Sequence, residues 1–306
     1  MSDIFDFRKC TLCPRECGAN RESAKAGICG TNDKISIARA SLHLWEEPCL
    51  SGANGSGTVF FTGCSLSCVY CQNSQISHKN TGYEIDENRL CEIFFELRSK
   101  GAHNINLVTA AHFLPNVLKA VEKAKVQGIS IPFVYNSSGY EKAEALTRAD
   151  GLIDIYLPDF KYFEEERAKK YSFAPDYPQV AKALIAEMVR QQPNCIFDEN
   201  GMMLKGVIVR HLMLPTGFYD SKKIVKYLHK TYGSKIYMSL MSQYTPFGNL
   251  ENYPELQQKI NAADYEKLID YAINLGVENA FIQDGESSSE SFIPDFSGQG
   301  IINEVK

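Results

Sequence analysis

The stretch GCSLSCVYCQN (63–73) places Cys64, Cys68 and Cys71 at the spacing C-x3-C-x2-C, directly after the apolar run TVFF (58–61). A closed structural zinc site takes four ligands. The nearest further candidate, His78, is interpreted as an exposed polar residue. Three thiolates on one loop can instead hold three irons of a [4Fe-4S] cluster and leave the fourth iron open. The stretch therefore predicts an iron–sulfur site with an open coordination position.

Around this loop, short apolar runs alternate with helical patterns. The expected strands are TVFFTG (58–63), NINLVT (104–109), IPFVYN (131–136), LIDIYL (152–157), GVIVRHL (206–212) and KIYMSL (235–240). The expected helices cover 86–100, 115–127, 140–149, 176–192, 221–231 and 262–275. Serial β-α units predict a parallel sheet with right-handed crossovers, either open and doubly wound or closed into a partial barrel. In both architectures the reactive groups gather at the carboxyl ends of the strands, where Cys64 lies.

Length and composition narrow the class of protein. The chain has 306 residues, of which 44% are hydrophobic, so it can bury a large core, and its length suggests two domains. A formal net charge of -5 argues against a nucleic-acid backbone as partner. No apolar run approaches the roughly 20 residues that cross a bilayer, and MSDIFDFRKC (1–10) does not resemble a signal peptide. We expect a cytoplasmic protein with neither nucleic-acid nor membrane partners.

A second group of cysteines lies near the start of the chain. Cys10, Cys13, Cys17 and Cys29 follow the spacing C-x2-C-x3-C-x11-C. Four thiolates suit a closed zinc site or a second [4Fe-4S] cluster, and the spacing does not separate the two. We therefore expect a cysteine-rich metal-binding module at 1–50, a core at 51–285 that begins with the connector SGANGSG (51–57), and a polar tail at 286–306. The isolated Cys49, Cys91 and Cys195 are assigned no role.

Several segments in chain order carry a family resemblance. They are CTLCPRECGANRESAKAGICG (10–30), LWEEPCLSGANGSGTVFFTGCSLSCVYCQN (44–73), NINLVTAAHFLP (104–115), DIYLPDFKY (154–162), VIVRHLMLPTG (207–217) and MSQYTP (241–246). Together they resemble the radical S-adenosylmethionine (radical SAM) superfamily. Within it, they resemble the pyruvate formate-lyase activating enzyme-related proteins that carry an N-terminal four-cysteine module.

The resemblance implies an α/β fold, a partial (β/α)6 barrel with the cluster near its top. The open iron would bind the amino and carboxylate groups of S-adenosylmethionine, and the reduced cluster would cleave it to a 5′-deoxyadenosyl radical that abstracts hydrogen from a substrate. The substrate implied by the family name is a glycyl-radical enzyme, with another peptide or a small molecule as the alternative. A flavodoxin or ferredoxin would supply the electron. Two other classes of protein are alternatives: a non-catalytic iron–sulfur electron-transfer protein, which needs a fourth ligand, and a zinc-stabilised binding module.

The resemblance also assigns residues to the cofactor. Arg210 matches an arginine that contacts S-adenosylmethionine, and Asp159 and Lys161 match an element that holds its charged end. Asn136 begins NSSG (136–139), where related enzymes have Asp-Thr-Asn-Gly, so a carboxylate is missing here. The place of a Gly-Gly-Glu element reads TAAH (109–112), in which His112 is a candidate site residue or a structural histidine. No residue is singled out as a catalytic acid or base.

Overall fold

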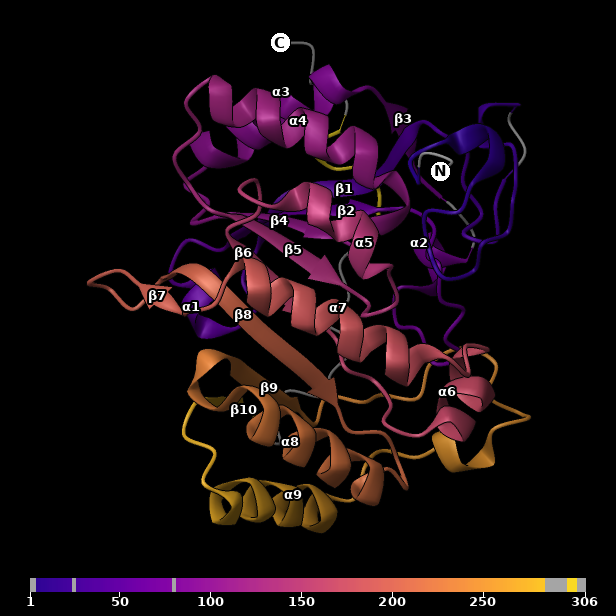
Figure 1. Ribbon diagram of the computed structural model, residues 1–306, viewed down its shortest axis with the longest axis vertical. Helices are drawn as coiled ribbons and strands as arrows, with labels where there is room; N and C mark the ends of the chain where they lie inside the picture. The colour runs from indigo at the N-terminus through magenta and orange to yellow at the C-terminus, as the bar shows by residue number, and fades with distance from the viewer. Residues whose placement is uncertain (1–3, 24–25, 79–80, 284–295, 302–306) are drawn as a thin grey trace.

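The computed structural model describes residues 4–23, 26–78, 81–283 and 296–301 (Figure 1). Its centre is one sheet with the strand order β10-β9-β8-β6-β5-β4-β2-β1-β3. The strands that run parallel are β2 (Ser56–Phe61), β4 (Ile105–Val108), β5 (Phe133–Ser137), β6 (Ile155–Pro158), β8 (Met203–Leu212), β9 (Tyr237–Met241) and β10 (Ala280–Ile282). This sheet forms an open, partial barrel, and all six predicted strands are present in it.

Helices cover the outer face of this sheet (Figure 1). They are α3 (Glu87–Ser99), α4 (Leu114–Val126), α5 (Ala143–Leu146), α7 (Tyr177–Gln191), α8 (Phe218–Tyr232) and α9 (Ala262–Leu275). Three shorter helices are α1 (Pro48–Ser51), α2 (Ser74–Ser77) and α6 (Glu165–Ser172). The pattern at 140–149 predicted a full helix, but only α5 and a 3-10 turn (Thr147–Ala149) form there. Part of the predicted helix is instead the loop that follows β5.

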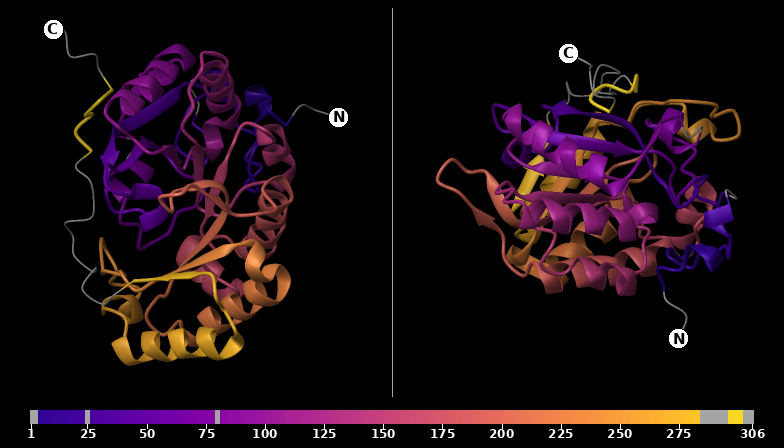
Figure 2. Two further views of the ribbon diagram at one scale, coloured as in Figure 1. Left: turned by 90° about the vertical axis from the view of Figure 1, so that its left-hand side faces the viewer. Right: turned by 90° about the horizontal axis from the view of Figure 1, so that it is seen from above.

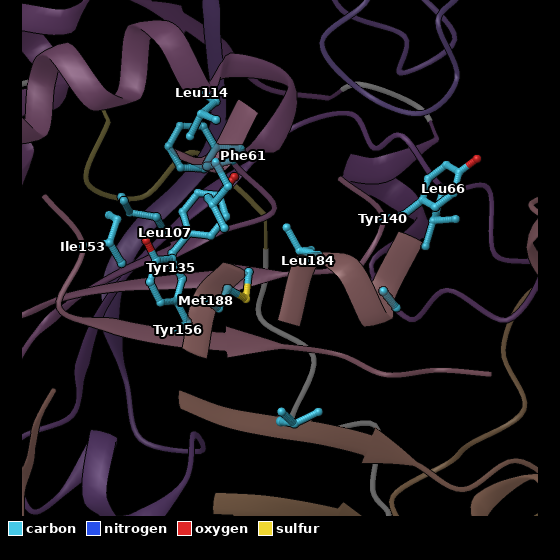
Figure 3. Close-up of a cluster of buried hydrophobic side chains, with 14 of the residues drawn as sticks. Phe61, Leu66, Leu107, Leu114, Tyr135, Tyr140, Ile153, Tyr156, Leu184 and Met188 are labelled. Carbon is cyan, nitrogen blue, oxygen red and sulfur yellow. The ribbon is translucent and has the colours of Figure 1, made fainter. Parts of the chain in front are cut away.

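Side chains on both faces of β2, β5 and β6 are buried, as expected for parallel strands that are covered on both sides. Figure 3 shows Phe61, Leu107, Tyr135 and Tyr156, from four neighbouring strands, in one cluster with Met188 of α7. On the inner face lies a second cluster that includes Val134, Ile155, Leu157 and Ile208. The inner face near the strand ends is polar, and this is where the site lies.

The N-terminal half of the sequence contributes a strand that was not predicted. In β1 (Ile35–His43), Ile37 pairs with Phe61 and His43 with Ser56, so β1 lies antiparallel to β2. A short β3 (Tyr83–Ile85) pairs with the start of β1. The predicted division at residue 50 therefore falls between two strands of one sheet. The apolar residues Phe7 and Leu12 also pack into the main core.

The described C-terminal segment, 296–301, lies along β1 (Figure 2). Ala40 N–H donates to Gln299 O at 2.8 Å, and Gly298 N–H donates to Ala38 O at 3.1 Å. The ring of Phe296 packs edge-on against that of Phe60, with centroids 5.4 Å apart. This segment covers backbone groups of β1 on the side away from β2. The rest of the predicted tail, 286–295 and 302–306, lies outside the described residues.

The fold also includes a hairpin outside the barrel, and its described helices differ from membrane spans in length or apolar character. A short β7 (Ile196–Phe197) pairs antiparallel with β8, and this hairpin projects from the body at the left of Figure 1. Among the described helices, none combines the length and the apolar character that crossing a membrane requires. The cytoplasmic location stays a prediction.

The loop after β5 contains a buried acid, Glu141, and from its surroundings we predict that the free energy of unfolding depends on pH. Glu141 accepts hydrogen bonds from Tyr135 Oη at 2.7 Å and from Ser137 Oγ, and burial raises its pKa to about 7. A folded-state pKa above the ordinary value of 4.5 means that the native state binds the proton more tightly. The free energy of unfolding should therefore fall as pH rises from 4.5 to 7 and then level off. Glu141 contributes at most about 1.4 kcal/mol per pH unit to this fall.

Urea denaturation of the wild type and of Glu141→Gln across this range measures the effect. Because glutamine cannot ionise, the variant should lose this part of the pH slope while it still accepts from Tyr135. Identical slopes in the two proteins would contradict a raised pKa at Glu141.

Candidate active site

The three-cysteine loop leaves the carboxyl end of β2 and is held by backbone contacts on both sides. Cys64 N–H donates to Cys29 O at 3.2 Å, and Val69 N–H donates to Tyr171 O at 2.9 Å. Gly63, at φ +82°, begins the loop, and a Cβ there would lie 2.5 Å from Thr31 Cγ2 and 2.6 Å from Cys29 O. Only glycine fits this close approach at this backbone angle. The loop is therefore built against the segment that contains Cys29.

The three thiols lie near one another, and two of them, those of Cys68 and Cys71, contact hydroxyl groups. Cys68 is buried and Cys64 and Cys71 are half-buried. Cys68 Sγ accepts from Ser172 Oγ at 3.0 Å, and Cys71 Sγ lies 3.3 Å from Ser77 Oγ. Burial raises the pKa of the Cys64 thiol far above its ordinary value, and the Cys68 and Cys71 thiolates raise it further. Among the described residues, no three His, Cys, Asp or Glu side chains take a metal-holding arrangement.

A cavity of about 260 Å³ adjoins this loop. Its lining joins Cys68, Tyr70 and Cys71 to all four predicted cofactor contacts, Asn136, Asp159, Lys161 and Arg210, and to apolar side chains that include Phe60, Val108 and Leu212. The four contacts come from β5, from the residues just after β6, and from β8. The prediction that these strand ends meet beside the cysteine loop agrees with the structure, whereas their role toward a cofactor stays a prediction.

Charged groups in the cavity form one network around Arg210. Its Nε donates to Asp159 Oδ1 at 3.0 Å and its Nη2 to Asn136 Oδ1 at 2.6 Å. Its Nη1 donates to Glu46 Oε2 at 3.3 Å. On the other side, Lys161 Nζ donates to Asp159 Oδ2 at 2.6 Å. The cavity wall thus carries two cations and two carboxylates that are paired and partly shielded from water.

The pKa values of the two acids are shifted in opposite directions. Burial alone would raise the pKa of Asp159, but Lys161 and Arg210 outweigh it and hold that pKa below its ordinary value. For Glu46, burial outweighs the attraction of Arg210, and the pKa is raised. Asp159 is therefore the ionised partner of both cations, and Glu46 is the acid of this network that more readily holds a proton.

Residues 58–198, which contain the cysteine loop, Asn136, Asp159 and Lys161, match the family model described as Radical SAM superfamily. The match assigns this segment to the radical SAM superfamily. Membership implies an enzyme that uses S-adenosylmethionine and a [4Fe-4S] cluster.

The chain is also similar to several known proteins. The uncharacterized protein MJ0674 of Methanocaldococcus jannaschii is 27% identical over 274 residues, which are 87% of this chain and 75% of the relative. SuiB of Streptococcus suis, in its S-adenosylmethionine-bound crystal structure, shares the fold with a TM-score of 0.50 at 13% identity, over 73% of this chain and 49% of SuiB. A domain of pyruvate-formate lyase-activating enzyme from Bacteroides vulgatus ATCC 8482 aligns with a TM-score of 0.40 at 10% identity, over 56% of this chain and 91% of the domain.

Sequence reasoning missed Glu46, which enters the cavity from the segment after β1. Besides Arg210, Glu46 accepts from Asn106 Nδ2 at 3.0 Å. Its neighbours His43 and Trp45 also line the cavity. The sequence signal for Glu46 was LWEEP (44–48), in which two adjacent acids stand in an otherwise apolar segment. This segment belongs to the family resemblance, but the resemblance assigns no role to either acid.

Two histidines considered from the sequence lie away from the cavity lining. His112 is buried behind the loop, with Nε2 2.7 Å from Thr62 O, and burial lowers its pKa to about 3. This geometry fits the structural reading of His112. His78 is exposed, as expected.

The N-terminal cysteines also gather in one place. Cys10 and Cys29 are buried. Residue 27 is a glycine, and a Cβ at this position would lie 3.3 Å from Cys17 Sγ and 3.4 Å from Cys29 Sγ. Burial raises the pKa of Cys13 to about 11, and the Cys29, Cys10 and Cys17 thiolates contribute. As in the loop, the four thiols do not converge in a metal-holding arrangement within the described part of the chain.

A fully buried arginine lies beside these thiols. Arg21 Nη1 is 3.7 Å from Cys10 Sγ, and its Nη2 donates to Asn32 O at 2.6 Å. The guanidinium also stacks 4.4 Å from the centre of the Phe7 ring. Among the residues that the structure describes, no carboxylate forms an ion pair with Arg21. Because a buried charge is costly without a counter-charge, a cation at this position suits a site that carries negative charge when it holds a metal.

A second arginine joins this module to the cysteine loop. Arg15, between Cys13 and Cys17, donates from Nε to Ser65 O at 2.9 Å. Its Nη1 donates to Phe173 O at 2.6 Å and its Nη2 to Ser172 O at 3.1 Å. Arg15 therefore fixes the end of α6 and the cysteine loop relative to the N-terminal module. The sequence offered no signal for this contact, because its partners are backbone carbonyls far along the chain.

Proposed function

We propose that this chain forms the 5′-deoxyadenosyl radical in the cavity described above, with Cys64, Cys68 and Cys71 as ligands of the [4Fe-4S] cluster. The observation that carries the proposal is the cavity itself. It adjoins a three-cysteine loop on one side and carries Asn136, Asp159, Lys161 and Arg210 on the other. The cavity thus has candidate cluster ligands on one side and both cationic and anionic side chains on the other. This arrangement suits a cofactor that carries both a carboxylate and an ammonium group.

The residues present fit these two groups. Three thiols on one loop supply ligands for three irons, and no further cysteine or histidine lies on the loop to close the fourth position. When bound and reduced, the cluster supplies the electron that cleaves the sulfonium of S-adenosylmethionine. Lys161 and Arg210 suit the carboxylate of that molecule, and Asp159 and Glu46 suit its ammonium group. Phe60, Val108 and Leu212 exclude water from the cavity, which protects a reactive radical from quenching.

The substrate and the electron donor rest on the sequence resemblance. It favours an activating-enzyme-like role, in which the hydrogen comes from a backbone glycine of a glycyl-radical enzyme and the electron from a flavodoxin or ferredoxin. A glycine-centred radical on such a partner, seen by electron paramagnetic resonance, would support this role. If the partner gains no radical, a different peptide or a small molecule is the substrate.

We also propose that Cys10, Cys13, Cys17 and Cys29 hold a second, closed metal centre, either zinc or an iron–sulfur cluster. Support comes from the buried Arg21 beside Cys10, since four thiolates around a metal carry a net negative charge that a buried cation neutralises. The gap left by Gly27 between Cys17 and Cys29 allows both sulfurs to turn toward one ion.

The test of the proposed function is product formation. Anaerobically reconstituted protein, reduced with dithionite and given S-adenosylmethionine, should release 5′-deoxyadenosine and methionine, measured by chromatography. Cys68→Ala should release neither, because the cluster is lost. Cys91→Ala is the matched control, since Cys91 is a buried cysteine on α3 whose Sγ faces Gln127 instead of the loop. Wild-type protein with a verified cluster and no more product than Cys68→Ala would show that the proposed function is wrong.

A further inference from the structure

Three buried hydroxyl groups form a line that ends on the sulfur of Cys68. Tyr70 Oη lies 2.6 Å from Tyr162 Oη, and Tyr162 Oη lies 2.7 Å from Ser172 Oγ. Ser172 Oγ donates to Cys68 Sγ at 3.0 Å. Tyr162 and Ser172 are completely buried, and Tyr70 is 7% exposed. The line connects residues of the cysteine loop through two residues that are far from it in sequence.

The direction of these hydrogen bonds follows from counting protons. A thiolate only accepts, so the single proton of Ser172 points to Cys68. Ser172 Oγ must then accept from Tyr162, and Tyr162 in turn accepts from Tyr70. All three hydroxyls are polarised toward the same sulfur. Away from water, such a chain strengthens its last hydrogen bond.

The position of Ser172 is fixed by its backbone. It is the last residue of α6, and Phe173 follows it in the left-handed region at φ +53°. Ser172 O accepts from Arg15, and the preceding Tyr171 O accepts from Val69 N–H on the cysteine loop. The hydroxyl is therefore held toward the loop from two independent directions. Few other orientations are open to it in a packed interior.

We propose that Ser172, oriented by Tyr162 and Tyr70, is a positioning residue that sets the reduction potential of the cluster through its hydrogen bond to Cys68. The inference rests on the proposed function, in which Cys68 is a cluster ligand. Hydrogen bonds to ligand sulfurs tune the potentials of iron–sulfur clusters. A donor at the sulfur stabilises the reduced cluster, which carries one more negative charge, and so raises the potential.

The outer end of the same line meets the cavity, because Tyr70 is part of its lining. A molecule bound against Tyr70 would contact the chain of hydroxyls that ends on the cluster ligand. Occupancy of the cavity and the ease of reducing the cluster are thereby linked. The step concerned is the uptake of one electron from an external reductant, with no bond formed or broken at Ser172.

Anaerobic redox titration of the reconstituted protein, followed by the electron paramagnetic resonance signal of the reduced cluster, tests this. Ser172→Ala should shift the midpoint potential to more negative values. Tyr162→Phe should shift it in the same direction by less, and Tyr70→Phe by less again. Two control variants remove buried hydroxyls with other partners: Ser65→Ala, whose Oγ contacts Tyr140 O, and Tyr156→Phe, whose Oη contacts Gln191. Both should keep the wild-type potential.

Iron and sulfide content separates the possible failures. Wild-type protein that takes up no cluster contradicts the proposed function itself. A loaded Ser172→Ala protein with the potential of Ser65→Ala overturns the inference and leaves the proposed function standing. If Ser172→Ala does not fold, Tyr162→Phe decides, because it keeps every backbone contact. An unchanged potential in that variant overturns the proposed line of hydroxyls.

Discussion

Replacement of Arg210 by methionine is expected to lower the free energy of unfolding by about 3–5 kcal/mol, because it leaves the buried Glu46 without its cation. Arg210 holds Asp159 and Glu46 directly, and its side chain is 17% exposed. Methionine retains much of the side-chain volume of arginine, so the loss of stability measures the effect of removing the charge. Lys161 still neutralises Asp159 in the variant, which leaves Glu46 as the uncompensated acid.

Chemical denaturation of matched variants measures this. Arg190→Met is the control, because Arg190 also pairs with two acids, Glu187 and Asp150, but its side chain is 54% exposed. Exposed pairs contribute little, so the control should lose less than about 1 kcal/mol. Adding Glu46→Gln to Arg210→Met should restore part of the stability. Equal losses in the two single variants would mean that the cavity network is as well solvated as the surface.

The sequence was sufficient to predict the parallel strands and the meeting of their polar ends. Runs such as TVFF (58–61) and VIV (207–209) are apolar on both faces, as in a sheet that is covered on both sides. Since parallel strands end at one edge, Asn136, Asp159 and Arg210 had to lie close together. The unpredicted β1 alternates small, polar and apolar residues and follows a cysteine-rich segment, so its signal was weak. With three residues, β10 is too short for any periodicity.

The contacts that reach across the fold were beyond sequence reasoning. Glu46 enters the cavity because β1 runs antiparallel to β2 and brings the following segment under the barrel. Ser172 reaches Cys68 across 104 residues of sequence, and Arg15 reaches Phe173 across 158. Neither depends on a local pattern. Each depends on where a helix end or a metal module packs, which is a property of the whole core.

The largest change in metal content is expected from Cys64→Ala, which should lose about four irons per chain, the content of one [4Fe-4S] cluster. Loss of one ligand from a loop that offers only three leaves too few thiolates to retain the cluster. Metal and sulfide analysis of anaerobically prepared protein measures this, with Cys91→Ala as the control. Metal that stays in Cys64→Ala identifies the second centre as zinc, or as iron with sulfide. A Cys64→Ala protein with wild-type iron would contradict the ligand assignment.

The companion variant, Cys17→Ala, tests whether the two sites depend on each other. It should remove the metal of the N-terminal module, and because metal binding is coupled to the folding of such modules, the module should loosen. The Arg15 contact to Ser65 O and the Cys29 contact to Cys64 N–H would then weaken, and the iron of the loop should fall in part. Cys64→Ala should leave the second metal in place, because Arg21 holds Cys10 from within the module. If Cys17→Ala loses only its own metal, the module does not support the cluster loop.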